Sequence, residues 1–311
     1  MTEVNETHRP KTVFKVVGVG DAGYNALNYL LRNKVPVDEL IAVNRPTLHP
    51  AMASDTMAPD PCPIEHLALG AVAVTETQEA LRGHFTGADL TFVSAEICND
   101  ADISLLTAIA ETARQAGLLV LGVVAVPGLA TGMAATASIM ELNEHFDAMI
   151  LAPEAWPVTA ISQHSDACSP HEYLLQQVIL GVTDEVTVQT RENIGYLHAK
   201  AELRSIPSLE GLAKIGIGLA SGETRAAIAV GKAMEESFLD LDTLTKAQAV
   251  YLVMSGSATM TMDEFNVVTR AVHAIINNDA SILAKVAIDD DLGEFIKVMI
   301  IASGLETSTV F

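Results

Sequence analysis

The sequence predicts an α/β fold in which helices cover a parallel sheet and a smaller α+β domain follows. Three observations predict it: short apolar runs of strand length recur along the chain, helical segments separate them, and a glycine-rich turn follows the first run. Strands that alternate with helices are typical of a parallel sheet covered on both faces. Half of the 311 residues are hydrophobic and 5% are aromatic, so we expect aliphatic cores.

The first half begins with a strand at Val13–Gly18 and a helix at Asn25–Asn33. A second helix is expected at Ile103–Ala116, and proline-rich stretches at 46–63 and 153–170 have loop composition. Four more apolar runs have the length of buried strands: Leu40–Val43, Leu90–Ala95, Leu118–Ala125 and Ala148–Ala152.

The second half begins with a helix at Glu172–Gly181, whose apolar residues share one face, and a short strand at Glu185–Gln189. A further block runs from about 208 to 305. Within it we expect helices at Glu223–Ser237 and Met262–Asn277 and strands at Ala249–Ser255, Ser281–Ile288 and Ile296–Ser303.

The net charge, the cysteines and the absence of long apolar runs indicate which partners and which cellular compartment to expect. Eighteen Lys and Arg residues against 39 Asp and Glu give a formal charge of -21, which would repel nucleic acid and anionic membranes. The three cysteines are widely spaced and suggest reduced thiols. Because residues 1–12 are polar and no apolar run reaches the roughly 18 residues of a membrane span, we expect a cytoplasmic protein without membrane insertion.

A glycine loop follows the first strand and opens a helix. Gly18, Gly20 and Gly23 form a GxGxxG pattern with Asp21 and Ala22 inside it. One interpretation is a dinucleotide site, and the Asn44-Arg45 end of the second strand would then suggest NADP. The other is that the glycines only close a strand-to-helix turn. Both remain open at this point.

Several motifs, in order and spacing, resemble the bacterial tubulin homologue FtsZ over residues 12–306. In the first half the similar segments are Gly18–Asn28, with Asn25 in the helix, Ile41–Asn44, Phe92–Ala95 and Gly122–Pro127. In the second half they are Gly216–Ala226, Thr261–Asn266 and Ala287–Glu294.

The resemblance implies a tubulin/FtsZ-like fold with a Rossmann-like domain, a central helix and a smaller activation-type domain. It also implies head-to-tail stacking, with GTP held by one subunit and hydrolysed with acids of the next. The expected segments are a disordered N-terminus at 1–12, a nucleotide-binding-type domain at 13–170, a central helix and strand at 171–191, a loop replacing the hydrolytic loop at 192–207, an activation-type domain at 208–306 and a tail at 307–311.

The chain departs from that family where the phosphates would lie. The family's glycine-threonine run after the fourth strand is replaced by a segment with three carboxylates, which repel phosphate. Asp100 or Asp102 could instead cap the helix from Ile103. The residues of this vestigial site are Glu96, Cys98, Asn99, Asp100 and Asp102, beside Asp21 of the glycine loop.

The other nucleotide contacts are also changed. The family's sugar and base motifs are replaced by Thr131–Ala134 and Glu154–Trp156. Only Glu172 could take the place of the acid that recognises guanine in the family. Alternatively, Glu172 only stabilises the start of a helix. In the hydrolytic loop the family's acids are lost at Gly195 and His198, while Asn193 remains. His198 could act as a general base, but it has no partner acid.

We therefore expect no catalytic residues, a pseudo-GTPase and no cofactor, although GTP or GDP binding stays possible. Acids near the phosphate position could pair with Arg191, His198 and Lys200 of the next subunit, so that chains assemble alone or with an authentic FtsZ-type filament. The alternatives are a module that caps such a filament, a residual GTPase and an NADP-dependent reductase.

A metal site is not expected. His164, Asp166, Cys168 and His171 gather possible ligands, but their spacing matches no structural zinc pattern, and we interpret them as an exposed loop.

Overall fold

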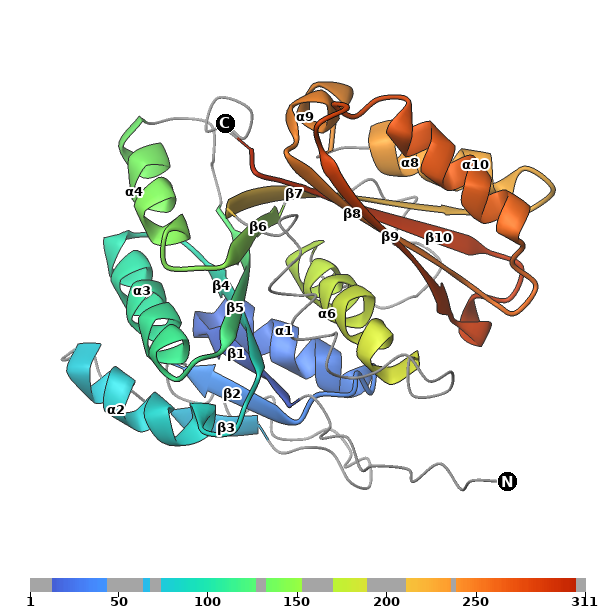
Figure 1. The fold of residues 1–311 in the computed structure, drawn as a ribbon. Helices are drawn as coiled ribbons and strands as arrows, with labels where there is room; N and C mark the ends of the chain where they lie inside the picture. Colours follow the sequence, from blue (N-terminus) through green and yellow to red (C-terminus); the bar gives the residue numbers. More distant parts are fainter. Residues whose placement is uncertain are drawn as a thin grey trace, which may run out of the picture.

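The computed structural model describes residues 13–43, 64–67, 74–126, 133–152, 170–188, 211–235 and 239–305. They form one sheet of ten strands in the order β3-β2-β1-β4-β5-β6-β7-β10-β8-β9, with helices on both faces (Figure 1). The predicted α/β fold class is confirmed. Among the helices described, none has both the length and the apolar character needed to cross a bilayer.

The first six strands are all parallel. Val17 of β1 lies between Ile41 of β2 and Val93 of β4, and all three side chains are buried. Strands covered on both faces carry continuous apolar runs, as these do. The strands are β1 (Phe14–Val19), β2 (Glu39–Val43), β3 (Ile64–Leu67), β4 (Leu90–Glu96), β5 (Leu119–Ala125) and β6 (Ala148–Ala152).

Two layers of helices cover this part of the sheet. One layer contains α1 (Gly20–Arg32) and α6 (Pro170–Val188), which pack on each other and share one hydrophobic core. The opposite layer contains α2 (Val74–Phe85), α3 (Asp100–Gln115) and α4 (Met133–Asn143), which contribute to the other core.

The second half extends the same sheet. β7 (Gly211–Ala220) pairs in parallel with β6, and β10 (Ile296–Ser303) lies antiparallel between β7 and β8 (Ala249–Gly256). β9 (Ser281–Ile288) forms the edge, parallel to β8. The helical elements are α8 (Arg225–Glu235), α9 (Leu241–Lys246), α10 (Met262–His273) and the short 3-10 turn η3 (Asp290–Leu292).

α6 connects the two halves of the sheet. The buried hydroxyl of Tyr251 in β8 donates to the main-chain oxygen of Gly181 in α6 at 3.0 Å. α8 and α10 lie over the other face of the second half (Figure 1). α8 packs so closely on β7 that a Cβ atom at Gly216 or Gly218 would collide with the main-chain oxygen of Ala233 or Ala229.

The structure corrects some predicted elements. β6, β9 and β10 have the predicted bounds, β2, β4, β5 and β8 differ by one residue at one end, and β1 is shifted by one residue at both ends. The strand predicted at Glu185–Gln189 is wrong, because residues 185–188 continue α6. α1 and α3 begin at Gly20 and Asp100, earlier than predicted. The prediction did not include β3, α2, α4, β7 or α9.

Candidate functional site

The carboxyl ends of β1 and β4 form a topological switch point. The two strands are parallel neighbours, but α1 leaves β1 toward one face of the sheet and α3 leaves β4 toward the other. Ligands of open α/β sheets bind in the crevice at such a point. The fold therefore brings the predicted glycine loop and the predicted acidic loop to the same place, although about 75 residues separate them in the sequence.

The glycine loop is explained by close packing. A Cβ atom at Gly18 would lie 2.5 Å from the main-chain oxygen of Gly23, and one at Gly23 would lie 2.5 Å from that of Ser94 in β4. Gly20 has a φ of 67°, which glycine adopts readily. The interpretation of the loop as a strand-to-helix turn is thus sufficient to account for all three glycines.

The start of α1 carries the rest of the predicted loop residues. Asp21 and Asn25 are exposed and Ala22 is half-buried. Val19 is the N-cap residue and makes no side-chain cap hydrogen bond. The carboxylate of Asp21 therefore lies in the first helical turn, where a negative charge is favourable to the helix and would oppose an approaching phosphate.

The acidic loop after β4 is closed by a capping box. Oδ1 of Asn99 accepts the backbone N–H groups of Ala101 and Asp102 at 2.9 and 3.3 Å. Oδ2 of Asp102 accepts those of Cys98 and Asn99 at 2.9 and 3.1 Å. The prediction that Asp100 or Asp102 is the N-cap of a helix from Ile103 is therefore wrong. Asn99 is the N-cap, and Asp102 is the third residue of the helix.

These bonds occupy four backbone donors of the acidic loop. Phosphate sites at helix N-termini and glycine loops depend on free backbone N–H groups that point at the anion. Here side-chain oxygens accept four such groups, two of them through the negative carboxylate of Asp102. The residues present at this loop do not fit a polyphosphate.

The pKa of the Cys98 thiol reflects the negative charges around it. Its pKa is raised, first by partial burial and then by the charges of Glu96 and Asp102, which disfavour a thiolate. The same charges disfavour any other anion at this position. Cys98 is therefore an exposed but unactivated thiol.

The start of α6 contributes a buried histidine to the same end of the sheet. Nε2 of His171 lies 3.0 Å from Oγ of Ser94 in β4 and 3.0 Å from the main-chain oxygen of Val123 in β5. Burial lowers the pKa of His171, which favours the neutral imidazole. Because the carbonyl oxygen of Val123 can only accept, the Nε2 atom carries the hydrogen and donates it to that oxygen. The interpretation of 164–171 as an exposed loop is wrong for His171, which is 5% exposed and belongs to α6.

Glu172 follows in the first turn of α6 and is half-buried. Its position agrees with a role at a helix start, where a carboxylate favours the helix dipole. Among the residues that the structure describes, no group of three His, Cys, Asp or Glu side chains is arranged to hold a metal ion.

Other predicted site residues lie outside the described ranges. They are Asn44, Arg45, Arg191, Asn193, Gly195, His198 and Lys200, together with 131–132, 154–156 and 164–168. The role that sequence reasoning missed is that of Asn99. A polar cap residue followed three positions later by an acid is the signal of a capping box, and the chain carries it at Asn99 and Asp102.

Comparisons with known proteins agree with this architecture. Residues 211–306 match the family described as "FtsZ family, C-terminal domain". The protein "Cell division protein FtsZ 1" of Archaeoglobus fulgidus is 27% identical over 317 residues, covering 97% of this chain and 85% of the relative. "Cell division protein FtsZ" of Buchnera aphidicola subsp. Schizaphis graminum is 25% identical, covering 94% of this chain and 79% of the relative.

Solved structures share the fold. An empty FtsZ dimer from M. jannaschii superposes with a TM-score of 0.73 at 21% identity, covering 97% of this chain and 92% of that chain. CetZ2 from Haloferax volcanii, solved as a GTPγS-bound protofilament, has a TM-score of 0.62 at 17% identity and covers 95% of this chain and 94% of that chain. The chain is thus similar to FtsZ proteins over almost its whole length, residues 211–306 match the C-terminal domain of that family, and the fold is the one that FtsZ and CetZ proteins share.

Proposed function

We propose that this chain is a cytoplasmic FtsZ-like protein that assembles head to tail without a cycle of GTP binding and hydrolysis. The capping box at Asn99 and Asp102 carries the proposal, because it occupies four backbone donors at the switch point. A triphosphate would have to break these bonds and lie against the carboxylate that accepts two of them. At about 4 Å, two unit charges repel by about 4 kcal/mol at an effective dielectric constant near 20.

Assembly would then depend on contacts between protein charges. Asp21, Glu96, Asp100 and Asp102 lie at the switch point and would pair with the basic residues of the next subunit, Arg191, His198 and Lys200, which belong to the part of the chain not described. One protein with this fold is solved as an empty dimer and another as a GTPγS-bound protofilament, which supports association between copies of such chains.

Nucleotide binding is tested by equilibrium dialysis and thermal shift with GTP, GDP and NADPH, together with a phosphate-release assay. A ligand at 100 times its Kd stabilises a protein by about 2.7 kcal/mol, so binding would be visible as a higher melting temperature. We expect no shift and no phosphate release. GTP binding with phosphate release would instead establish the residual GTPase, and a shift with NADPH alone would favour the reductase.

Assembly is tested by sedimentation and light scattering with and without GTP. We expect the amount of assembled protein to be the same with and without GTP and to decrease at high salt. The double variant His198→Asp and Lys200→Asp should abolish it, whereas Lys246→Asp on α9 serves as a charge-reversal control. Monomers at every concentration would contradict self-assembly. If such monomers form a one-to-one complex with an FtsZ-type filament protein, the capping alternative holds.

A further inference from the structure

β9 (Ser281–Ile288) is one edge of the ten-stranded sheet. Among the described residues it pairs only with β8, and this pairing runs over eight consecutive positions without a bulge. An edge strand presents a row of backbone N–H and C=O groups that another strand can bind. β9 therefore offers a long and regular edge for pairing.

The edge at β9 lacks the protection that native proteins usually give to such a strand, namely a short length, a charge, a proline or a bulge. The opposite edge has it, since β3 is four residues long and carries Glu65 and His66. In contrast, β9 has no proline, and none of residues 280–288 is acidic although 39 of the 311 residues of the chain are. Its one charged residue, Lys285, is 8% exposed and donates to the buried hydroxyl of Tyr251.

Two apolar side chains of β9 are exposed. Val286 is 42% exposed and Ile288 is 50% exposed. Because side chains alternate between the faces of a strand, both share a face with Ile282 and Ala284, which pack against the core that α8 and α10 cover. A strand added beside β9 would cover part of these side chains as well as the backbone groups.

A second copy of β9 fits this edge in an antiparallel pair about a two-fold axis. Side chains directly opposite each other in such a pair share a face, so the axis passes beside a residue that faces its own copy. An axis at Lys285 would place two lysines opposite each other. An axis at Ala284 would bring Asp289 close to the partner's Asp279, and an axis at Ala287 would shorten the ladder to residues 285–289.

An axis at Val286 avoids these three disadvantages. Residues 283–289 of the two copies then lie opposite each other, and Val286 faces its own copy. Ile288 faces the partner's Ala284, so the exposed apolar side chains meet on one face.

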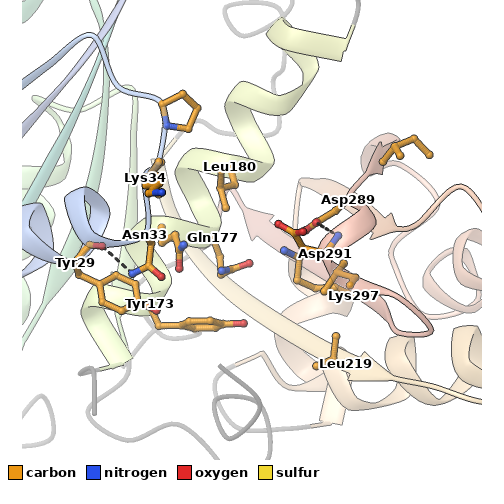
Figure 2. Close-up of a pocket in the computed structure, with 15 residues that line it drawn as sticks. Tyr29, Asn33, Lys34, Tyr173, Gln177, Leu180, Leu219, Asp289, Asp291 and Lys297 are labelled. Atoms are coloured by element: carbon orange, nitrogen blue, oxygen red, sulfur yellow. Dashed lines mark hydrogen bonds between the residues drawn. The ribbon is translucent and has the colours of Figure 1, made fainter. Parts of the chain in front are cut away.

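The acidic turn after β9 also favours this register. Asp289 and Asp291 lie close together, and Oδ1 of Asp289 accepts the backbone N–H of Asp291 at 3.2 Å (Figure 2). With the axis at Val286, each turn lies beside residues 281–283 of the other copy, which carry no charge. The two turns are then roughly 27 Å apart along the ladder, well beyond the Debye length of about 8 Å.

We propose that two copies of this chain associate through β9 in an antiparallel two-fold pair centred on Val286, which joins their sheets into one. This contact is separate from the head-to-tail contact proposed above, because it depends on backbone groups and apolar side chains and not on pairs of opposite charge. It closes on itself, since each copy uses its β9 edge once.

Sedimentation velocity of the full chain in about 1 M NaCl tests the pairing, because the Debye length is then about 3 Å. Head-to-tail contacts between charges weaken under this condition, and the repulsion between two acidic chains is screened. We expect dimers at micromolar concentration. Val286→Lys should raise the Kd of the dimer by about tenfold or more, because it places like charges opposite each other although it lowers the net negative charge.

Ile228→Lys is the matched control. Ile228 is 45% exposed, but it belongs to α8, which packs on β7, three strands or about 14 Å from the edge. This variant should leave the Kd of the dimer unchanged. Wild-type monomers at every protein concentration would overturn the proposal, and so would an equal loss of dimer in the two lysine variants.

Disulfide formation tests the register. With the axis at Val286, the two Cα atoms at this position lie about 4.5–5.5 Å apart, within the range of about 4.4–6.8 Å that a disulfide needs. The two positions at Ile288 lie about 14 Å apart along the ladder. Under mild oxidation Val286→Cys should form a covalent dimer, whereas Ile288→Cys should form no more than the wild type, whose exposed Cys98 sets the background. Equal cross-linking of the two variants, or none above the wild type, would contradict the proposed pairing.

Discussion

Replacing Asp102 by alanine measures the strength of the capping box at the start of α3. The substitution removes the acceptor of two backbone N–H groups, those of Cys98 and Asn99, at 2.9 and 3.1 Å. Loss of a cap costs roughly 0.5–2 kcal/mol, and loss of a carboxylate from the first helical turn costs about 0.3–1 kcal/mol. Because this loop is exposed and water can reach the released donors, we expect a total destabilisation of about 1–2 kcal/mol.

The assay is urea denaturation followed by circular dichroism, with Asp100→Ala as the matched control. Asp100 is exposed in the same turn, and the structure gives no hydrogen bond to its carboxylate among the described residues. We expect its variant to lose only the helix-dipole contribution, about 0.3–1 kcal/mol. Asp102→Asn keeps one acceptor oxygen and should fall between the two. If Asp100→Ala destabilises the protein as much as Asp102→Ala, the capping box does not hold the loop and the argument against phosphate loses its basis.

Two other perturbations test the packing and the buried histidine. Gly218→Ala would place a Cβ atom against the main-chain oxygen of Ala229 and should cost about 1–3 kcal/mol, whereas Gly231→Ala in α8, with open space around it, should stabilise by about 0.5–1 kcal/mol in the same urea assay. The pKa of His171 is lowered in the folded state, so the unfolded state takes up a proton at a higher pH than the folded state does. The free energy of unfolding therefore has its full value above the unfolded-state pKa of about 6.5 and decreases as the pH drops toward the folded-state pKa. The melting temperature should therefore fall more steeply from pH 7 to pH 5 in the wild type than in His171→Asn, and parallel curves would show that protonation of His171 is not coupled to folding.

Much of the fold could be predicted from local patterns. Strands that are buried on both faces carry continuous apolar runs, which is why the parallel strand β6 and the antiparallel strand β10 were predicted with the observed bounds. β7 was missed because Gly216 and Gly218 weaken the strand signal, and the structure shows that they admit the backbone of α8. The strand predicted at Glu185–Gln189 failed because valine and threonine favour strands locally, while in the structure these positions extend α6 to Val188.

The candidate site likewise combines features that the sequence predicts with features that only the tertiary structure determines. The sequence by itself determined the chemistry of its two loops, namely a glycine turn with Asp21 and an acidic segment from Glu96 to Asp102. Only the tertiary structure decided that these loops meet, since that depends on β1 pairing with β4 across some 75 residues of intervening chain. It also decided that Asn99 and Asp102 bind the backbone donors. The physical reason is that residue type and spacing act between near neighbours, whereas strand order, donor occupancy and cavity shape arise from packing between distant segments.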